Sequence, residues 1–351
     1  METDHRVVVG DARDMESLAD DSVDLVVTSP PYPLIEQWDE TFAGLDPAIG
    51  DALAAGDGEC AFALMHDVLD AVWDEVARVL APGGIVCVNV GDATRKVDGE
   101  FRLWPNHAEI SRRLTDRGLS ALPGIVWRKA TNSPNKFMGS GMLPPNAYPT
   151  LEHEHVLVVR NGGPRSLPPG DDARYESAYF WEERNEWFSD QWELAGEDQT
   201  RGVVAETRER SAAFPLELPL RLIRMFSTYG DRVLDPFWGT GTTGLAALLA
   251  GRDSVGYELD GGFVDAFADR LDGIAERSHE RARQRLAAHR EFVADRREAG
   301  NPPAYEAEHY DVGVVTKQER RIRLYAVTGV QAAEPGAGVD ARWVARYDPV
   351  E

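Results

Sequence analysis

The fold is decided by the stretch V-D-L-V-V-T-S-P-P-Y, which occupies residues 23–32. Its first five residues predict a strand buried on both faces, and Pro30 and Pro31 prevent further strand pairing or helix. The chain must leave the sheet at a strand's carboxyl end, where open α/β sheets bind their ligands. A hydroxyl, a carbonyl and the ring of Tyr32 meet there and suit a planar substrate such as a nucleobase. Taken alone, the motif fits a strand ending in a proline turn equally well.

A second stretch, V-L-D-P-F-W-G-T-G-T-T-G at residues 233–244, leads into an apolar helical run and then into V-G-Y-E at 255–258. Together the two stretches resemble the amino-methyltransferases of DNA. In that family Asp, Asn or Ser, followed by Pro-Pro and an aromatic residue, forms the catalytic tetrapeptide, and the cofactor loop reads D-P-F-x-G-x-G-T-T. The tetrapeptide precedes the cofactor loop here, so the order resembles the circularly permuted β group. The resemblance covers residues 6–275.

The resemblance implies an α/β fold with a doubly wound, mostly parallel sheet of the Rossmann-like methyltransferase type. We expect residues 1–160 to form its catalytic half and residues 214–275 its cofactor-binding half. Residues 161–213 are the candidate target-recognition segment, inserted between the two halves. Residues 276–351 form a C-terminal extension of a helix and a hairpin, to which no function is assigned.

S-adenosylmethionine is the cofactor that the resemblance implies, and no metal is expected. Asp235, at a strand end, suits the ammonium group of this cofactor, and Glu258 corresponds to the residue that binds the ribose hydroxyls in the family. Asp11 would lie beside the adenine, although a capped turn explains it as well, and Phe214 would contact the methionine end. The other predicted cofactor-binding residues are Thr28, Pro236, Phe237, Gly239, Thr240, Gly241, Thr242 and Thr243.

The glycines at 239–244 also satisfy the G-x-G-x-x-G pattern of nicotinamide dinucleotide sites. Asp235 and Pro236 argue against that competitor, because a pyrophosphate requires a neutral or positive turn whereas a carboxylate suits an ammonium group. The glycines would let the backbone approach the cofactor closely.

The predicted catalytic residues are Ser29, Pro30, Pro31 and Tyr32. An exocyclic amine of a base is a poor nucleophile because its lone pair is delocalised into the ring. The Ser29 hydroxyl and the Pro30 carbonyl can hold the amine, while Tyr32 stacks on the ring. Methylation at cytosine C5 would need a cysteine after a proline, and neither Cys60 nor Cys87 follows one. The substrate base must flip out of duplex DNA.

In the resembled family a serine at the first position accompanies mostly cytosine N4, and an aspartate mostly adenine N6. We therefore expect a cytosine-N4 methyltransferase acting on double-stranded DNA, with adenine N6 as the alternative. An RNA amino-methyltransferase and an inactive DNA-binding protein also stay open. The whole-chain pattern resembles archaeal restriction-modification or orphan methylases, so CTAG is a candidate target and a cognate restriction endonuclease a candidate partner.

The chain carries 37 basic and 60 acidic residues, a net charge of −23 that opposes binding of a polyanion. Only four lysines occur, and an acidic, lysine-poor surface predicts a high-salt cytoplasm, in which the Debye length falls to about 3 Å. DNA contact must then come from local arginines. Residues 161–213 mix aromatic residues with arginines and form the first candidate, with a small aromatic core as the alternative. The loop at 128–149 is the second.

Two cysteines offer no disulfide framework, no signal peptide opens the chain, and no run reaches the about 20 apolar residues of a membrane span. A cytoplasmic protein is expected. Residues 33–60 predict a long loop, with Trp38 as a candidate wall of the base pocket or else part of a simple insertion. Residues 263–297 predict one long charged helix, and residues 312–315 and 321–330 the arms of a hairpin.

Overall fold

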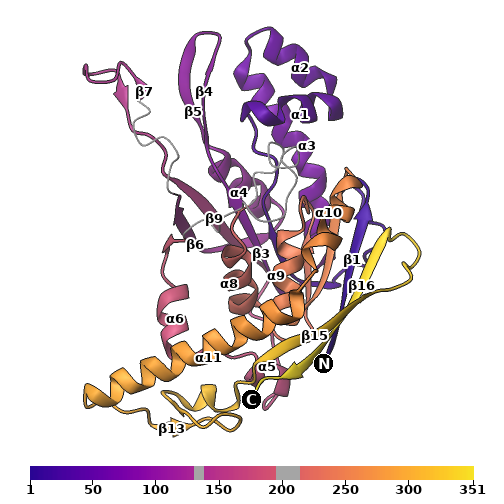
Figure 1. Cartoon of the computed structure of the whole chain (residues 1–351). Helices are drawn as coiled ribbons and strands as arrows, with labels where there is room; N and C mark the ends of the chain where they lie inside the picture. The colour runs from indigo at the N-terminus through magenta and orange to yellow at the C-terminus, as the bar shows by residue number, and fades with distance from the viewer. Residues whose placement is uncertain (130–137, 195–213) are drawn as a thin grey trace.

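The computed structural model describes residues 1–129, 138–194 and 214–351 (Figure 1). Its framework is one ten-stranded sheet within these residues, with helices on both faces. From one edge to the other, the sheet consists of β10 (Gln191–Glu193), β6 (Leu119–Arg128), β9 (His153–Asn161), β3 (Leu80–Val90), β2 (Val23–Thr28), β11 (Arg232–Asp235), β12 (Asp253–Glu258), β1 (Glu2–Val9), β16 (Ala341–Pro349) and β15 (Tyr325–Ala332).

The five central strands, β3, β2, β11, β12 and β1, pair in parallel along their whole order. Strand β9 is antiparallel to both of its neighbours, and β16 is antiparallel to β1 and β15. The sheet is therefore mostly parallel, as the sequence predicts. Because β2 and β11 are neighbours, the tetrapeptide and the cofactor loop leave the sheet side by side although about 200 residues separate them in the sequence.

Strand β2 shows why the sheet needs helices on both faces. Leu25 and Val27 point into one apolar layer, whereas Val26 points into the other, and all three are almost completely buried. The first layer is covered by α8 (Glu217–Phe226), α9 (Thr242–Ala250), α10 (Gly262–Arg270) and the start of α11 (Ile274–Glu298). The second layer is covered by α1 (Asp39–Leu45), α2 (Pro47–Ala54), α3 (Gly58–Val79) and α4 (Asn106–Asp116).

The prediction of a loop at residues 33–60 was wrong, because this segment contains the turn η1 (Glu36–Trp38) and the helices α1 and α2. Pro47 stands in the first turn of α2, where a proline is tolerated, and Asp46 caps that helix by accepting the Ala48 N–H at 2.9 Å. Phe42 and other apolar side chains of these helices are buried in the second layer. Trp38 is partly buried and packs against this layer.

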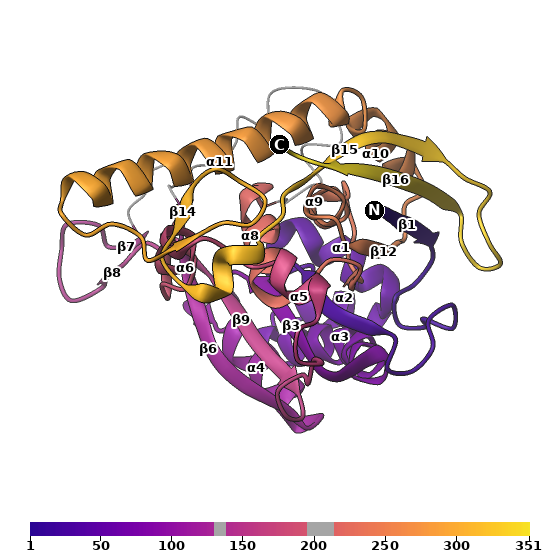
Figure 2. The same cartoon turned by 90° about the horizontal axis from the view of Figure 1, so that it is seen from below.

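The C-terminal part also differs from the expectation. The predicted helix at 263–297 is two helices, α10 and α11, which meet at Gly273 in a left-handed conformation with φ of 65°. The two predicted arms contain strands, but their pairing with each other was wrong: β15 pairs with β16, and β14 (Gly313–Val314) pairs with β13 (Tyr305–Glu306). The β15–β16 hairpin extends the main sheet beyond β1, which Figure 2 shows from below.

The candidate recognition segment is only partly described. Its described part contains α5 (Asp172–Glu176), α6 (Trp181–Trp187) and strand β10, which lengthens the main sheet beside β6. Phe180, Trp187 and Trp192 are buried, but Phe180 packs in the cluster around α11 and Trp192 in the first layer of the main sheet, so these rings do not form one small aromatic core. Arg201, Arg208 and Arg210 lie outside the described residues.

The remaining described elements are short. They are β4 (Ala93–Val97) paired with β5 (Glu100–Trp104), β7 (Met138–Gly139) paired with β8 (Ala147–Tyr148), and the turn η2 (Lys317–Arg321). Among the described helices, none combines the length and the hydrophobicity that crossing a membrane requires.

Candidate active site at the carboxyl edge of the sheet

The predicted cofactor-binding and catalytic residues converge at the carboxyl ends of the parallel strands. Thr28 ends β2, Asp235 ends β11 and Glu258 ends β12. The Thr28 hydroxyl donates to Asp235 Oδ1 at 2.6 Å, which ties the start of the tetrapeptide to the start of the cofactor loop. The two motifs therefore form one site rather than two.

Asp235 is a buried carboxylate without a cationic partner among the described residues. It accepts the Thr28 hydroxyl and the Phe237 N–H, at 2.6 and 3.1 Å. Burial, and to a smaller extent the charge of Glu258, raises the pKa of Asp235 to about 6, although the hydrogen bonds to its charged form oppose the rise. Such a group is stabilised by a cation brought to it, and the ammonium of S-adenosylmethionine has that chemistry.

Glu258 closes the other side of the cofactor loop. Its Oε2 accepts the Gly239 N–H at 2.7 Å, and its Oε1 accepts the Asp260 N–H at 3.0 Å. Burial, followed by the nearby Asp260 carboxyl, raises the pKa of Glu258 above its ordinary value. Both oxygens are thus held at the end of β12, with lone pairs left for hydroxyl donors.

The glycine loop packs closely against the helices behind it. Gly239 and Gly241 have positive φ angles of 51° and 74°, and a Cβ on Gly241 would collide with the rings of Phe267 and Trp238. Trp238 is buried under the loop. This packing fixes a turn that only glycine can form and directs the loop into the N-terminus of α9.

The threonines of the loop are buried and bonded to the scaffold. Thr243 donates to the Val27 carbonyl at 3.2 Å, which fastens α9 to β2. Arg270 donates to the carbonyl of Thr240 at 2.6 Å and to the Thr242 hydroxyl at 3.2 Å. No sequence motif singles out Arg270, because it lies in a separate helix, α10.

In the tetrapeptide, Tyr32 is buried, with 8% of its surface exposed, and its hydroxyl is part of a polar network. That hydroxyl lies 2.9 Å from Ser29 Oγ, accepts from Asn89 Nδ2 at 3.0 Å and donates to Glu154 Oε2 at 3.2 Å. Burial, with Glu154 as the second cause, raises the pKa of Tyr32 well above its ordinary value, so the phenol stays neutral. Pro30 is buried, and Pro31 is partly buried beside it.

Glu154 and Lys129 were missed by the sequence reasoning. Glu154 accepts from Asn89 Nδ2 at 2.6 Å and pairs with Lys129 Nζ at 2.7 Å. The Oδ1 atom of Asn89 is buried without a hydrogen-bond partner among the described residues. A polar residue in each of the apolar runs 85–90 and 154–159 is the signal that could have identified Asn89 and Glu154.

The other predicted cofactor-binding residues lie at or near the same edge. Asp11 follows β1, and its carboxylate accepts the backbone N–H of Arg13 at 2.9 Å and pairs with the Arg13 guanidinium, which is the capped turn of the alternative. Phe214 and Pro236 are buried. The Phe237 ring lies 5.9 Å from that of Trp73 in an edge-on arrangement. The cofactor-binding roles of these residues stay predictions.

A histidine and aspartate group lies beside this network. Asp92, His107 and His155 bring possible metal-ligating atoms within 4.8 Å of one another. The His107 and His155 rings are stacked, however, with centroids 4.1 Å apart and planes only 20° from parallel. A metal ion lies in the plane of each imidazole that binds it, and two stacked planes share no such position. We therefore assign no metal to this group.

A doubly wound sheet with a buried carboxylate, a glycine loop and a second carboxylate at adjacent strand ends defines the Rossmann-like methyltransferase fold, and such enzymes use S-adenosylmethionine. The family model N6_N4_Mtase, described as DNA methylase, matches residues 23–269. The chain therefore belongs to the N6/N4 family of DNA methyltransferases.

Relatives of known identity agree with this membership. The chain is 50% identical over 93% of its length to the type II methyltransferase M.MthZI of Methanothermobacter thermautotrophicus, of which it covers 91%. It is 51% identical over 74% of its length to M.MjaI of Methanocaldococcus jannaschii, of which it covers 88%. A candidate DNA modification methylase from Thermus thermophilus, solved with S-adenosyl-L-methionine, is similar with a TM-score of 0.58 and 34% identity; the match covers 76% of this chain and 93% of that one.

Proposed function

We propose that this DNA methyltransferase transfers a methyl group to the exocyclic N4 of a cytosine flipped out of duplex DNA. The observation that carries the proposal is the identity and setting of Ser29. The first position of the tetrapeptide, where many members of the resembled family have an aspartate, is here the neutral Ser29. Its hydroxyl oxygen lies 2.9 Å from the Tyr32 hydroxyl at the carboxyl edge of the sheet. Serine at this position accompanies mostly cytosine N4 in the resembled family. Adenine N6 is the alternative.

The cofactor would be held by Asp235 at its ammonium group, by Glu258 at its ribose hydroxyls and by the glycine loop along its length. A buried, uncompensated carboxylate at Asp235 supports this assignment, since a cation would relieve the cost of its burial. When bound, S-adenosylmethionine supplies an electrophilic methyl group. The roles of Asp11 and Phe214 follow from the resemblance alone.

The target amine would be activated by acceptors rather than by a covalent adduct. Ser29 Oγ and the Pro30 carbonyl would accept its two N–H groups and favour the pyramidal nitrogen that attacks the methyl group. The Asn89 Oδ1 would be a further acceptor for the amine. Both described hydrogen bonds of the Asn89 amide are donated by Nδ2, and Oδ1 has no described partner. The ring of Tyr32 would stack on the base once the base enters.

Recognition of duplex DNA is proposed for the segment 161–213 together with the loop that begins at Arg128. The described part of this segment supports a surface role for Trp181 and Phe188, which are 36% and 39% exposed. The arginines that would follow the phosphates lie in the part that is not described. An arginine-rich local face would overcome the repulsion from the net charge of −23.

The motif order of the β group and a CTAG target are further parts of the proposal. We also propose that the enzyme acts in a restriction-modification system with a partner endonuclease. We further propose that it comes from a halophilic archaeon and works in the cytoplasm. The neighbouring positions of β2 and β11, and relatives from Methanothermobacter and Methanocaldococcus, are compatible with the motif order and the source. Protection of CTAG sites from cleavage after incubation with the enzyme would test the target directly.

The decisive assay incubates the enzyme with methyl-labelled S-adenosylmethionine and duplex DNA, followed by digestion to nucleosides. Label in N4-methylcytosine supports the proposal, and label in N6-methyladenine alone rejects the choice of base. A parallel reaction with RNA tests the RNA alternative. Cofactor binding without transfer to any nucleic acid would favour an inactive DNA-binding protein.

A further inference from the structure

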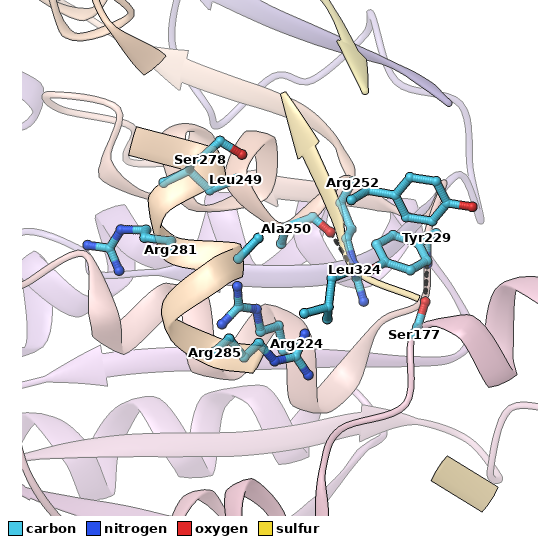
Figure 3. Close-up of a pocket in the computed structure, with 12 residues that line it drawn as sticks. Ser177, Arg224, Tyr229, Leu249, Ala250, Arg252, Ser278, Arg281, Arg285 and Leu324 are labelled. Carbon is cyan, nitrogen blue, oxygen red and sulfur yellow. Dashed lines mark hydrogen bonds between the residues drawn. The ribbon is translucent and has the colours of Figure 1, made fainter. Parts of the chain in front are cut away.

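A small cavity lies at the amino ends of β11 and β12, at the opposite edge of the sheet from Asp235 and Glu258. Its walls come from α8, the end of α9, one side of α11 and the start of β15 (Figure 3). The volume is about 20 Å³, which admits one or two water-sized particles. The cavity therefore lies between the predicted C-terminal extension (α11 and β15) and the helices α8 and α9, which cover one face of the main sheet.

Four arginines line this cavity, and three of them are paired. Arg252 donates to the hydroxyl and to the carbonyl of Ser227, at 3.0 and 2.8 Å. Arg285 forms an ion pair with Glu183, and its Nη2 donates to Glu183 Oε2 at 2.8 Å. Arg281 lies 3.7 Å from a carboxylate of α8. Arg281 and Arg285 are therefore paired with carboxylates, whereas Arg252 is held by neutral hydrogen-bond acceptors.

The fourth, Arg224, makes no hydrogen bond or ion pair with the described residues. Figure 3 shows its side chain beside that of Arg285 at the cavity. Burial, and then the like charge of Arg285, lowers the pKa of Arg224 to about 10, although the charges of Glu183 and Glu217 oppose the fall. A partly buried guanidinium next to another cation is costly unless a negative group binds to it.

Two serine hydroxyls that line the same cavity can also donate hydrogen bonds. Ser177 Oγ accepts the Tyr229 N–H at 2.8 Å, and Ser278 Oγ accepts the Val327 N–H at 2.9 Å. Neither hydroxyl donates to an acceptor among the described residues, so both hydrogens are left for a ligand. A cavity that offers donors fits an anion better than water, which must also donate its own hydrogens.

We propose that this cavity binds a small inorganic anion such as chloride, which accepts from Arg224 and the neighbouring hydroxyls. The anion would link α11 and β15 to α8 and α9, and so fasten the C-terminal extension to the catalytic sheet. A phosphate of the DNA backbone does not fit the volume or the position at the far edge of the sheet. The proposal is independent of the choice of substrate base.

Thermal unfolding at constant ionic strength tests the site, with gluconate, which is too large for the cavity, replaced stepwise by chloride. The full-length protein should show a saturable rise in Tm of several degrees, because chloride binds only the folded state. Arg224→Met should be at least as stable as the unmodified protein in gluconate, since it removes a partly buried charge that forms no ion pair with the described residues, and should lose the chloride response. Arg221→Met, one turn away on α8 and already paired with Glu217, should keep it.

If chloride raised the Tm of the unmodified protein and of Arg224→Met by the same amount, the proposal would be overturned, because a general salt effect acts on both proteins. Crystals of the unmodified protein soaked in bromide provide a second measurement that does not depend on the folding of a variant. An anomalous peak within hydrogen-bond distance of Arg224 is expected. A cavity without such a peak would equally overturn the assignment.

Discussion

Each of the two edges of the sheet contains a charged group without an ion-pair partner among the described residues, and the two charges are of opposite sign. At the carboxyl edge Asp235 is buried and has no cationic partner, and at the amino edge Arg224 is partly buried and forms no ion pair, although the charges of Glu183 and Glu217 act to raise its pKa. Proteins keep buried charges of this kind where a counter-charge arrives from outside. The comparison leads us to propose a ligand site at each edge, one found through a sequence motif and the other without one.

The largest expected effect separates catalysis from cofactor binding within the carboxyl edge. Ser29→Ala removes the hydroxyl that would hold the target amine and should lower kcat by about 10²-fold. Cofactor affinity, measured by calorimetry, should stay unchanged, because Asp235 and Glu258 are untouched. A kcat of Ser29→Ala equal to that of the unmodified enzyme would show that the Ser29 hydroxyl has no part in the chemical step.

The second prediction tests the carboxylate side of the comparison. Asp235→Ala should weaken S-adenosylmethionine binding by about 1–3 kcal/mol, as for the loss of a charged hydrogen bond. Asp235→Asn, which keeps the shape and loses the charge, should weaken binding by a similar amount. DNA binding should change far less in both variants. Cofactor affinity equal to that of the unmodified protein would refute the assignment of Asp235.

The third prediction follows from the raised pKa of Asp235, about 6 against an ordinary 3.8. Because the folded state holds this proton more tightly, the carboxyl contributes stability to the cofactor-free protein below pH 3.8, and this contribution is lost as the pH rises through 6. Affinity for the cationic cofactor should change in the opposite direction and fall as the pH drops below 6. Calorimetric titrations on both sides of this pH should show the fall, and Asp235→Asn should lack it.

The sequence predicted the site at the carboxyl edge but not the cavity at the amino edge, and the reason is how the residues of each are distributed along the chain. Asp235 and Gly241 belong to one continuous loop, so a short motif identifies them, and the five-residue run of β2 was enough to predict a strand buried on both faces. Arg224 and Ser177 come from separate segments, and only the folded chain brings them to one cavity. The helices α1 and α2 were missed because Gly44 near the end of α1, and Pro47 and Gly50 in α2, looked like loop residues.

A smaller effect is expected at Glu154, which acts through Tyr32 and Asn89. Glu154→Ala should lower kcat roughly tenfold by loosening both side chains, and Glu154→Gln, which keeps an acceptor, should recover most of that loss. Cofactor affinity should be unchanged in both variants. Equal defects in the two variants would indicate that the charge toward Lys129 matters rather than the positioning.

The smallest expected effect tests whether the two edges are independent. Asp235→Asn and Arg224→Met lie at opposite edges of the sheet and share no described partner. Their effects on the free energy of unfolding should therefore add to within about 0.5 kcal/mol in chemical denaturation of the double variant. A larger coupling would show that the anion cavity and the cofactor site communicate through the sheet.

The central claim, methylation of cytosine N4 through Ser29, is tested most directly by mass spectrometry of nucleosides from duplex DNA treated with S-adenosylmethionine. The unmodified enzyme and Ser29→Ala should be compared side by side. N4-methylcytosine should form with the unmodified enzyme and fall by about 10²-fold in the variant. N6-methyladenine as the sole product, or equal product from both proteins, would contradict the account.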